Sequence, residues 1–197
     1  MKISDDELYQ VSYMHFNLLK DGFLANLGCD FLYLLYQEIY ASDNATLIVV
    51  REGNSVSGFI AGGTGLAPIY LRLLKSPVKL FYTILPKLLN RRMLAQLFFL
   101  FFRNKRVSYI RKPQTSAELY SICVAREFHG SGVADELYLK LSQYFADKKV
   151  EEFLIFVGEK LDRAQNFYIK RGAVKVGRLA QGADKMSIIF AQKIARE

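Results

Sequence analysis

"AREFHGSGVADELY", residues Ala125–Tyr138, places two glycines between an apolar run and a segment with helical periodicity. The run before it, "ELYSICV", has the composition of a strand, and after Gly132 apolar residues recur at every third or fourth position. A strand, a glycine turn and a helix in this order commonly form an anion site, because the first N–H groups of a helix have no partners inside it. We therefore expect an anion-binding loop at this point of the chain.

The composition indicates one folded domain. The 197 residues are 51% hydrophobic and 14% aromatic, which suffices for a large core and excludes a disordered chain. Cys29 and Cys123 lack the spacing of metal ligands, and the N-terminus "MKISDDELY" is acidic where a signal peptide would be basic and then apolar. We therefore expect a cytoplasmic protein with free thiols, no structural disulfide and no metal.

Positive charge is concentrated between residues 53 and 117. The net charge of the chain is +8, yet this segment carries eleven basic residues and no acidic one, so the remainder is −3. Prolines punctuate the segment, and we expect a basic, aromatic insertion of short helices over residues 66–112. Its uncharged run Met93–Phe102 has ten residues, whereas a membrane span needs about 20.

Several roles remain open for this insertion. It can cover the domain's own core, or it can dock peripherally on an anionic membrane or a lipid-linked substrate. Nucleic-acid binding is not expected, because the chain has no recognised nucleic-acid motif.

Two helices and a hairpin are predicted before the insertion. Ser4 is a candidate N-cap of the first helix, and "DFLYLLYQEIY", residues 30–40, has the periodicity of the second. Residues 45–63 contain two apolar runs joined at "EGNS", which is typical of a hairpin.

Strands and helices alternate after the insertion. Residues 117–124 are predicted to form a strand, followed by a helix, a strand, a helix and two closing strands. Strict alternation in the first of these strands predicts two faces, with Leu119, Ser121 and Cys123 on one and Glu118, Tyr120, Ile122 and Val124 on the other.

Two common phosphate sites do not fit the glycine loop. A Walker loop needs Lys and then Ser or Thr after its last glycine, where this chain has Val133 and Ala134. A dinucleotide fingerprint needs a small residue at the position of Asp135. ATP and dinucleotide binding are therefore disfavoured.

From Glu118 to Ala173 the chain resembles the GNAT superfamily of acyl-CoA-dependent N-acetyltransferases. The family carries a strand ending in Val and a loop Arg/Gln-x-x-Gly-x-Gly/Ala before a helix, and "HGSGVA", residues 129–134, is similar to that loop. Its second motif, Asn-x-x-Ala-x-x-Phe-Tyr-x-Lys-x-Gly-Phe, is similar to "LDRAQNFYIKRGA", residues 161–173.

The resemblance covers most of the chain and excludes the basic insertion. It implies a single α/β domain with a mixed, mostly antiparallel central sheet flanked by helices, and we expect the basic helical insertion to lie between strands 3 and 4. Residues 1–65 would supply the leading helices and hairpin, and residues 113–197 the acyl-CoA-binding core.

The resemblance also implies acetyl-CoA as co-substrate, with its pyrophosphate as the anion. Glycines in the loop permit close backbone approach, so that successive N–H groups can face a phosphate. The expected contacts are His129, Gly130, Ser131, Gly132, Val133 and Ala134 to the pyrophosphate, and Ile122, Cys123 and Val124 to the pantetheine arm. His129 stands where the family has Arg or Gln, and Leu161 replaces an Asn whose contact Asn166 could make.

Two catalytic residues are implied. In such enzymes a primary amine attacks the acyl thioester directly in a ternary complex. Tyr168 occupies the position of the family's thiolate acid, and Glu118 lies six residues before Val124, at the offset of the glutamate base of histone acetyltransferases. The alternative role of Tyr168 is that of a core tyrosine, and the alternative role of Glu118 is that of an ion-paired glutamate at the end of a strand. His15 is expected to be structural.

The basic insertion bears on the acceptor. A basic wall repels a cationic polyamine and favours an amine that carries phosphate or lies at a lipid surface. We expect an amino sugar on a nucleotide or lipid carrier. The alternative is a non-catalytic module that binds acyl-CoA, membrane or another protein, which the departures at His129 and Leu161 keep open.

Overall fold

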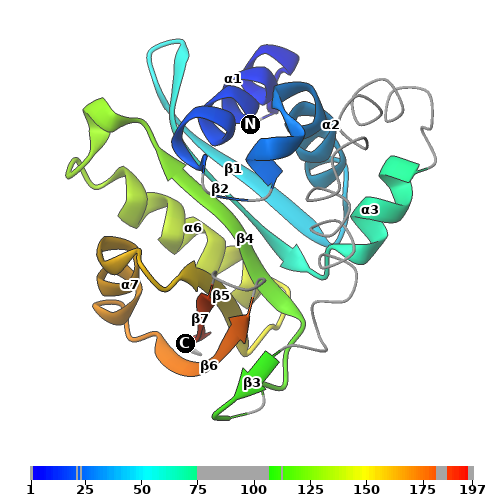
Figure 1. The fold of residues 1–197 in the computed structure, drawn as a ribbon. Coiled ribbons are helices and arrows are strands. Elements are labelled where there is room, and N and C mark those ends of the chain that lie inside the picture. The colour runs from blue at the N-terminus through cyan, green and yellow to red at the C-terminus, as the bar shows by residue number, and fades with distance from the viewer. Residues whose placement is uncertain are drawn as a thin grey trace.

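A computed structural model describes residues 2–20, 22, 24–74, 107–111, 113–180 and 186–194. Seven strands form one sheet in the order β1-β2-β4-β5-β7-β6-β3, and β4 and β5 are its parallel pair (Figure 1). The expected α/β fold with a mostly antiparallel sheet flanked by helices is confirmed.

Its helices are α1 (Asp5–Leu18), α2 (Cys29–Tyr40), α3 (Ala67–Leu74), α6 (Val133–Asp147) and α7 (Asp162–Ile169). Its strands are β1 (Ala45–Glu52), β2 (Ser55–Thr64), β3 (Val107–Tyr109), β4 (Ala117–Val124), β5 (Glu152–Gly158), β6 (Val174–Ala180) and β7 (Met186–Lys193).

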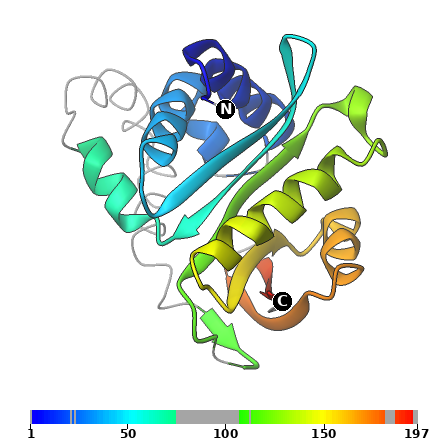
Figure 2. The same ribbon diagram turned by 180° about the vertical axis from the view of Figure 1, so that it is seen from behind.

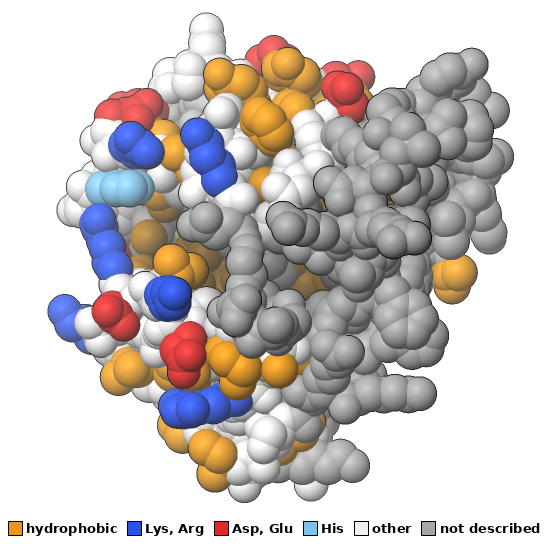
Figure 3. Space-filling model, viewed as in Figure 1, with side chains coloured by type: hydrophobic (Ala, Val, Ile, Leu, Met, Phe, Trp, Pro, Cys, Tyr) orange, Lys and Arg blue, Asp and Glu red, His pale blue; other side chains and the backbone are white. Residues whose placement is uncertain are grey.

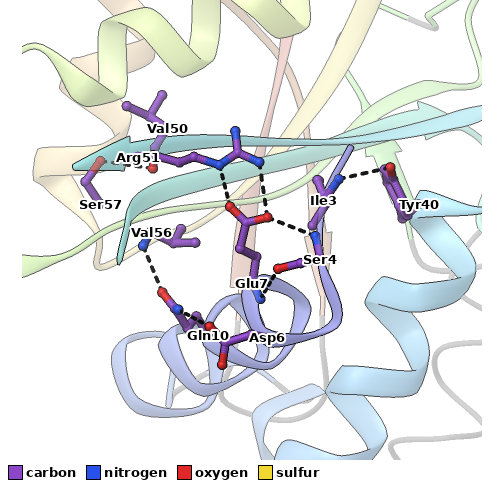
Figure 4. A network of polar contacts seen from close by, with 10 residues as sticks. All are labelled: Ile3, Ser4, Asp6, Glu7, Gln10, Tyr40, Val50, Arg51, Val56 and Ser57. Carbon is purple, nitrogen blue, oxygen red and sulfur yellow. Dashed lines mark hydrogen bonds and ion pairs between the residues drawn. The ribbon is translucent and has the colours of Figure 1, made fainter. Parts of the chain in front are cut away.

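Helix α1 is fixed at its start and against the hairpin by polar contacts (Figure 4). Ser4 is the predicted N-cap, and it forms a capping box in which its Oγ accepts from the Glu7 N–H while Glu7 accepts from the Ser4 N–H. Glu7 also pairs with Arg51 of β1, and the hydrogen bond from Arg51 lowers the pKa of that carboxyl. Gln10 accepts from the Val56 N–H of β2 at 2.8 Å, so the pair of Glu7 with Arg51 and this hydrogen bond hold α1 on the β1–β2 hairpin.

The sheet separates two hydrophobic layers. Adjacent residues of β2, Phe59 and Ile60, pack into different clusters, one beneath α1 and α2 and the other beneath α6. Figure 2 shows α6 from the side opposite to the view of Figure 1. The glycines of β2 allow α6 to lie close, since a Cβ at Gly62 would come within 2.8 Å of Leu141 and one at Gly58 within 3.0 Å of Leu137.

A bulge interrupts β4. Ala61 of β2 pairs with Ser121, whereas the next residue, Gly62, pairs with Leu119, so Tyr120 is an extra residue on β4. A bulge of this kind leaves one residue without a partner position and changes the facing of those beyond it.

The predicted faces of β4 are therefore wrong for two residues, because Leu119 and Tyr120 each lie on the opposite face from the one expected. Leu119 packs in the α6 layer together with Ile122 and Val124. Cys123 packs in the α1/α2 layer, and Ser121 makes a hydrogen bond to that layer. The periodicity assumed an unbroken strand, and the bulge reverses the alternation between Leu119 and Ser121.

The basic insertion is described only at its two ends. It begins after β2 with α3, which Arg72 fixes to α2 through the Glu38 carbonyl and carboxylate at 3.0 and 3.1 Å. Residues 107–109 form β3, which pairs with β6, where a helical insertion was expected to continue to residue 112. The helices predicted for residues 75–106 lie outside the described residues. No helix in the described ranges is long and apolar enough to cross a bilayer.

Candidate functional site

The glycine loop lies between the end of β4 and the start of α6, at the upper left of Figure 1. Gly130 and Gly132 have φ values of +88° and +91°, in the left-handed region that favours glycine. A Cβ at either position would meet nothing within 4 Å, so backbone conformation and not crowding requires glycine there. The predicted left-handed glycine turn is confirmed, and its second glycine is the N-cap of α6.

The loop's backbone N–H groups fall into two sets. Those of His129 and Ser131 donate to the carbonyls of Arg126 and Phe128, at 3.2 and 3.3 Å, in a short turn. The expectation that every N–H from residue 129 to 134 is free is therefore wrong for these two. The N–H groups without a hydrogen-bond partner among the described residues are those of Gly130, Gly132, Val133 and Ala134. Three of them, those of Gly132, Val133 and Ala134, lie at the N-terminus of α6, where the helix dipole also favours an anion.

Side chains of the loop stabilise the loop itself. His129 is exposed, and its Nε2 donates to the Val124 carbonyl at 3.0 Å, which ties the imidazole to the end of β4. Ser131 Oγ donates to the Phe128 carbonyl at 2.8 Å. Anion binding by this loop would thus rest on backbone groups, with His129 as a brace.

The strands β4 and β5 part beside the loop. Within the described sheet they pair only at Glu118 with Leu154 and Leu119 with Ile155, while β5 continues to Gly158 against β7. The edge of β4 that faces β5 beyond Leu119 therefore has backbone groups without a strand partner. On this face of the molecule Figure 3 shows a hollow, left of centre, with hydrophobic side chains in its floor and lysine and arginine side chains beside it.

Tyr168 lies on α7 and is 4% exposed. Its ring is 5.9 Å from that of Tyr138 on α6 and 5.3 Å from that of Phe167. Burial raises the pKa of its phenol, so the group stays protonated at neutral pH. Arg171, which the sequence motifs did not single out, pairs with Asp135 in the first turn of α6 and thereby connects α7 to the loop.

The other predicted residues lie along β4 and α7. Glu118 is half-buried at the point where β4 and β5 still pair, opposite Gly63 on its other side. Cys123 is buried toward α1, and burial raises the pKa of its thiol to about 12, so it is neither ionised nor facing the gap. Ile122 and Val124 are half-buried, and Asn166 is exposed on α7.

A polar chain that the sequence did not predict crosses the α1/α2 layer. His15 Nδ1 lies 2.6 Å from the hydroxyl of Tyr36, and this hydroxyl lies 2.8 Å from Ser121 Oγ. His15 and Tyr36 are buried, and burial lowers the pKa of His15 to about 4. His15 was expected to be structural, but nothing in the sequence indicated its partners.

An open groove of about 590 Å³ lies between the end of β1, the loop and the first turns of α6. Lys140 and Glu136 line it and pair with each other at 2.6 Å. Among the described residues no cluster of His, Cys, Asp and Glu could hold a metal ion, and both cysteines are unpaired.

Comparisons with known proteins place this arrangement in a family. The profile of the acetyltransferase (GNAT) domain matches residues 75–184, more than half of the chain. A comparison with curated protein sequences finds no significant match.

Solved structures with the same fold cover the chain almost completely. An acetyltransferase assigned to the GNAT family from Desulfovibrio desulfuricans is 14% identical with a TM-score of 0.64, covering 98% of this chain and 96% of its own. An aminoglycoside 6'-N-acetyltransferase complexed with coenzyme A is 14% identical with a TM-score of 0.60, covering 96% and 92%. PaiA N-acetyltransferase from Thermoplasma acidophilum, also complexed with coenzyme A, is 12% identical with a TM-score of 0.58, covering 98% and 96%.

Proposed function

Because the chain belongs to the family of GNAT acetyltransferase domains, we propose that it transfers an acetyl group from acetyl-CoA to a primary amine. The observation that carries this proposal is the loop before α6, whose unpartnered N–H groups adjoin the unpaired edge of β4. The first feature suits a pyrophosphate and the second suits the amide groups of a pantetheine arm. The pyrophosphate and the pantetheine arm are parts of one extended molecule, coenzyme A.

The residues divide the binding of acetyl-CoA between them. Its pyrophosphate takes the N–H groups at Gly130 and Gly132 and those of the first turn of α6, Val133 and Ala134. The pantetheine arm lies along Ile122–Val124 and pairs with backbone groups of β4, much as a strand would. His129 and Ser131 hold the loop in shape, and Asn166 on α7 contacts the arm.

The reaction is a direct acyl transfer in a ternary complex. The amine nitrogen forms a bond to the thioester carbon, and the C–S bond breaks to release the coenzyme A thiolate. Glu118 accepts the proton that the amine loses, and Tyr168 donates a proton to the departing thiolate. A phenol is protonated at neutral pH, so Tyr168 has a proton to give, although the burial that raises its pKa also makes it a weaker acid.

For the acceptor we propose an amino sugar that carries phosphate, on a nucleotide or a lipid. The support is the charge of the basic insertion, eleven basic residues without an acidic one. Arg72 and Arg111, which the structure describes at its ends, pair with Glu38 and Glu152 and hold elements of the domain together. Phosphate recognition, or peripheral contact with an anionic membrane that presents such a lipid, therefore falls to the basic residues between them.

Binding and transfer are tested in two steps. Acetyl-CoA at a hundred times its Kd should stabilise the protein by about 2.7 kcal/mol, which raises Tm by about 5–11 °C for a chain of this size. Release of thiol is then measured with a nucleotide-linked amino sugar, an aminoglycoside and spermidine. Turnover with spermidine alone would contradict the proposed acceptor. A rise in Tm without turnover of any amine would indicate a non-catalytic acyl-CoA-binding module, and no rise would exclude acetyl-CoA.

A further inference from the structure

Hydrogen bonds connect His15 through Tyr36 to Ser121 of β4, which lies beside the gap between β4 and β5. His15 on α1 and Tyr36 on α2 lie in a mostly apolar layer, where a polar group is costly unless it is hydrogen-bonded. Ser121 is half-buried and lies two residues beyond the last position at which β4 pairs with β5. The polar chain thus ends beside the gap in which, on the proposed function, the thioester must lie.

The hydrogen bonds that connect His15, Tyr36 and Ser121 have a preferred direction. The His15 imidazole is neutral at neutral pH and so has one ring nitrogen that accepts. Nδ1 lies 2.6 Å from the Tyr36 hydroxyl, a distance that suits donation by the tyrosine. Tyr36 has one proton, and once it is donated to His15 the hydroxyl of Ser121 must donate to Tyr36.

Because Ser121 donates its proton to Tyr36, its oxygen has lone pairs but no proton to offer to a bound ligand. A hydroxyl in this state accepts hydrogen bonds and cannot donate one. The oxygen of a thioester is only an acceptor, whereas an amine or ammonium donates. Ser121 would therefore distinguish the acceptor amine from the acetyl group beside it.

Resting on the acetyl transfer proposed above, we infer that Ser121 binds the acceptor amine and that Tyr36 and His15 orient its hydroxyl. Ser121 is then a catalytic residue that touches substrate, and Tyr36 and His15 are positioning residues. The N–H of the amine donates to Ser121 Oγ, which directs the nitrogen lone pair at the thioester carbon. The amine's departing proton still goes to Glu118, because its transfer along the chain would leave a cation on a buried imidazole.

The bulge in β4 and the contacts of α1 give this arrangement its rigidity. The extra residue Tyr120 shifts the alternation so that Ser121 faces α2. Tyr36 packs edge-on against Phe59 of β2, with ring centroids 5.2 Å apart. The Ser121 hydroxyl is held in one direction by Tyr36, which His15 and Phe59 fix in turn, so it binds a donor without first losing rotational freedom.

Hydroxyl deletions test the assignment with the amine that gives the highest rate in the panel. Ser121→Ala and Tyr36→Phe should each lower kcat/KM for the amine by about tenfold or more, while the rise in Tm with acetyl-CoA stays as in the wild type. His15→Asn, which offers an acceptor in place of the imidazole nitrogen, should retain more activity than His15→Leu. The matched control is Ser12→Ala, because Ser12 is also buried on α1 but donates only within its helix, to the Leu8 carbonyl at 2.7 Å.

The direction of the chain is measured without an acceptor. Nitrogen NMR of the two histidines at neutral pH should show His15 with its proton on Nε2, and Tyr36→Phe should shift the Nδ1 resonance. A proton on Nδ1 would reverse the chain and overturn the inference. A wild-type protein that transfers acetyl groups, with Ser121→Ala and Tyr36→Phe equally active, would overturn this inference alone. A wild type without transfer would refute the proposed function and this inference with it.

Discussion

Acid should destabilise this protein through His15 well above the pH at which carboxylates are protonated. The imidazole is 4% exposed and its pKa in the folded state is about 4, against 6.5 for the unperturbed group. The unfolded chain therefore binds a proton between these two values and the folded chain does not. Above about pH 6.5 the neutral His15 therefore costs the folded state nothing relative to the unfolded chain. The free energy of unfolding falls as the pH drops from about 6.5 toward about 4, and below about pH 4 His15 adds no further loss.

The two pKa values set the size of the effect. By linkage, the free energy of unfolding should fall by about 2 kcal/mol between about pH 8 and about pH 5, and by about 3 kcal/mol at about pH 4. For a chain of this size the first change corresponds to a fall in Tm of about 4–8 °C. Glu7 and Glu152, whose pKa values are lowered by Arg51 and Arg111, add their own losses at lower pH.

Comparison with His15→Asn isolates the histidine. Asparagine does not titrate and can still accept from Tyr36, so the carboxylate terms are shared by both proteins and cancel in the difference. Urea unfolding of each at several pH values gives that difference directly. Wild type should lose its advantage over the variant as the pH falls toward about 4. Parallel pH profiles would show that His15 is protonated in the folded state as readily as in the unfolded chain, and would refute the burial argument.

Further substitutions test the loop, the proposed acid and the cap of α1. Gly132→Ala should lower the free energy of unfolding in urea by about 1–2 kcal/mol, and so should the control Gly53→Ala in the β1–β2 turn, where φ is +59°. Only Gly132→Ala should weaken acetyl-CoA binding, by about tenfold in a thermal-shift titration. Tyr168→Phe should lower kcat by about a hundredfold or more and leave the acetyl-CoA Tm shift unchanged; equal turnover would exclude Tyr168 as the acid. Glu7→Gln should cost about 1 kcal/mol at neutral pH through loss of the charged pair with Arg51. This difference should shrink as acid protonates the wild-type carboxyl, at a pH below the ordinary range of a glutamate because Arg51 lowers its pKa.

Local signals predicted most of the elements. Ser4 with Glu7 three residues later specifies the start of α1, and "EGNS" specifies the hairpin, in which Gly53 adopts a positive φ. The strand predicted at residues 117–124 matches β4 in both bounds. Each of these signals is a short-range preference of the backbone or an uninterrupted period of burial, and both can be recognised in a single sequence.

Features that depend on distant partners were not predictable in the same way. Residues 107–109 form a strand because β6 offers an edge to pair with, although β6 lies some seventy residues later in the chain. The loop was predicted as an anion site from its two glycines, yet the sequence could not show that the N–H groups of His129 and Ser131 are already used. That division follows from the turn Arg126–Phe128, which has no glycine or proline to mark it.

The bulge in β4 lies next to the residue for which we propose a role in binding the amine, Ser121. Tyr120 breaks the period because β2 passes from Ala61 to Gly62 while β4 passes from Ser121 to Leu119. An unbroken strand would have put Ser121 in the α6 layer and taken its hydroxyl away from Tyr36. The irregular backbone instead directs a polar side chain into the α1/α2 layer, next to the point where β4 leaves β5. Departures from local regularity at a position of this kind are expected where a fold is shaped by a binding site and not by packing alone.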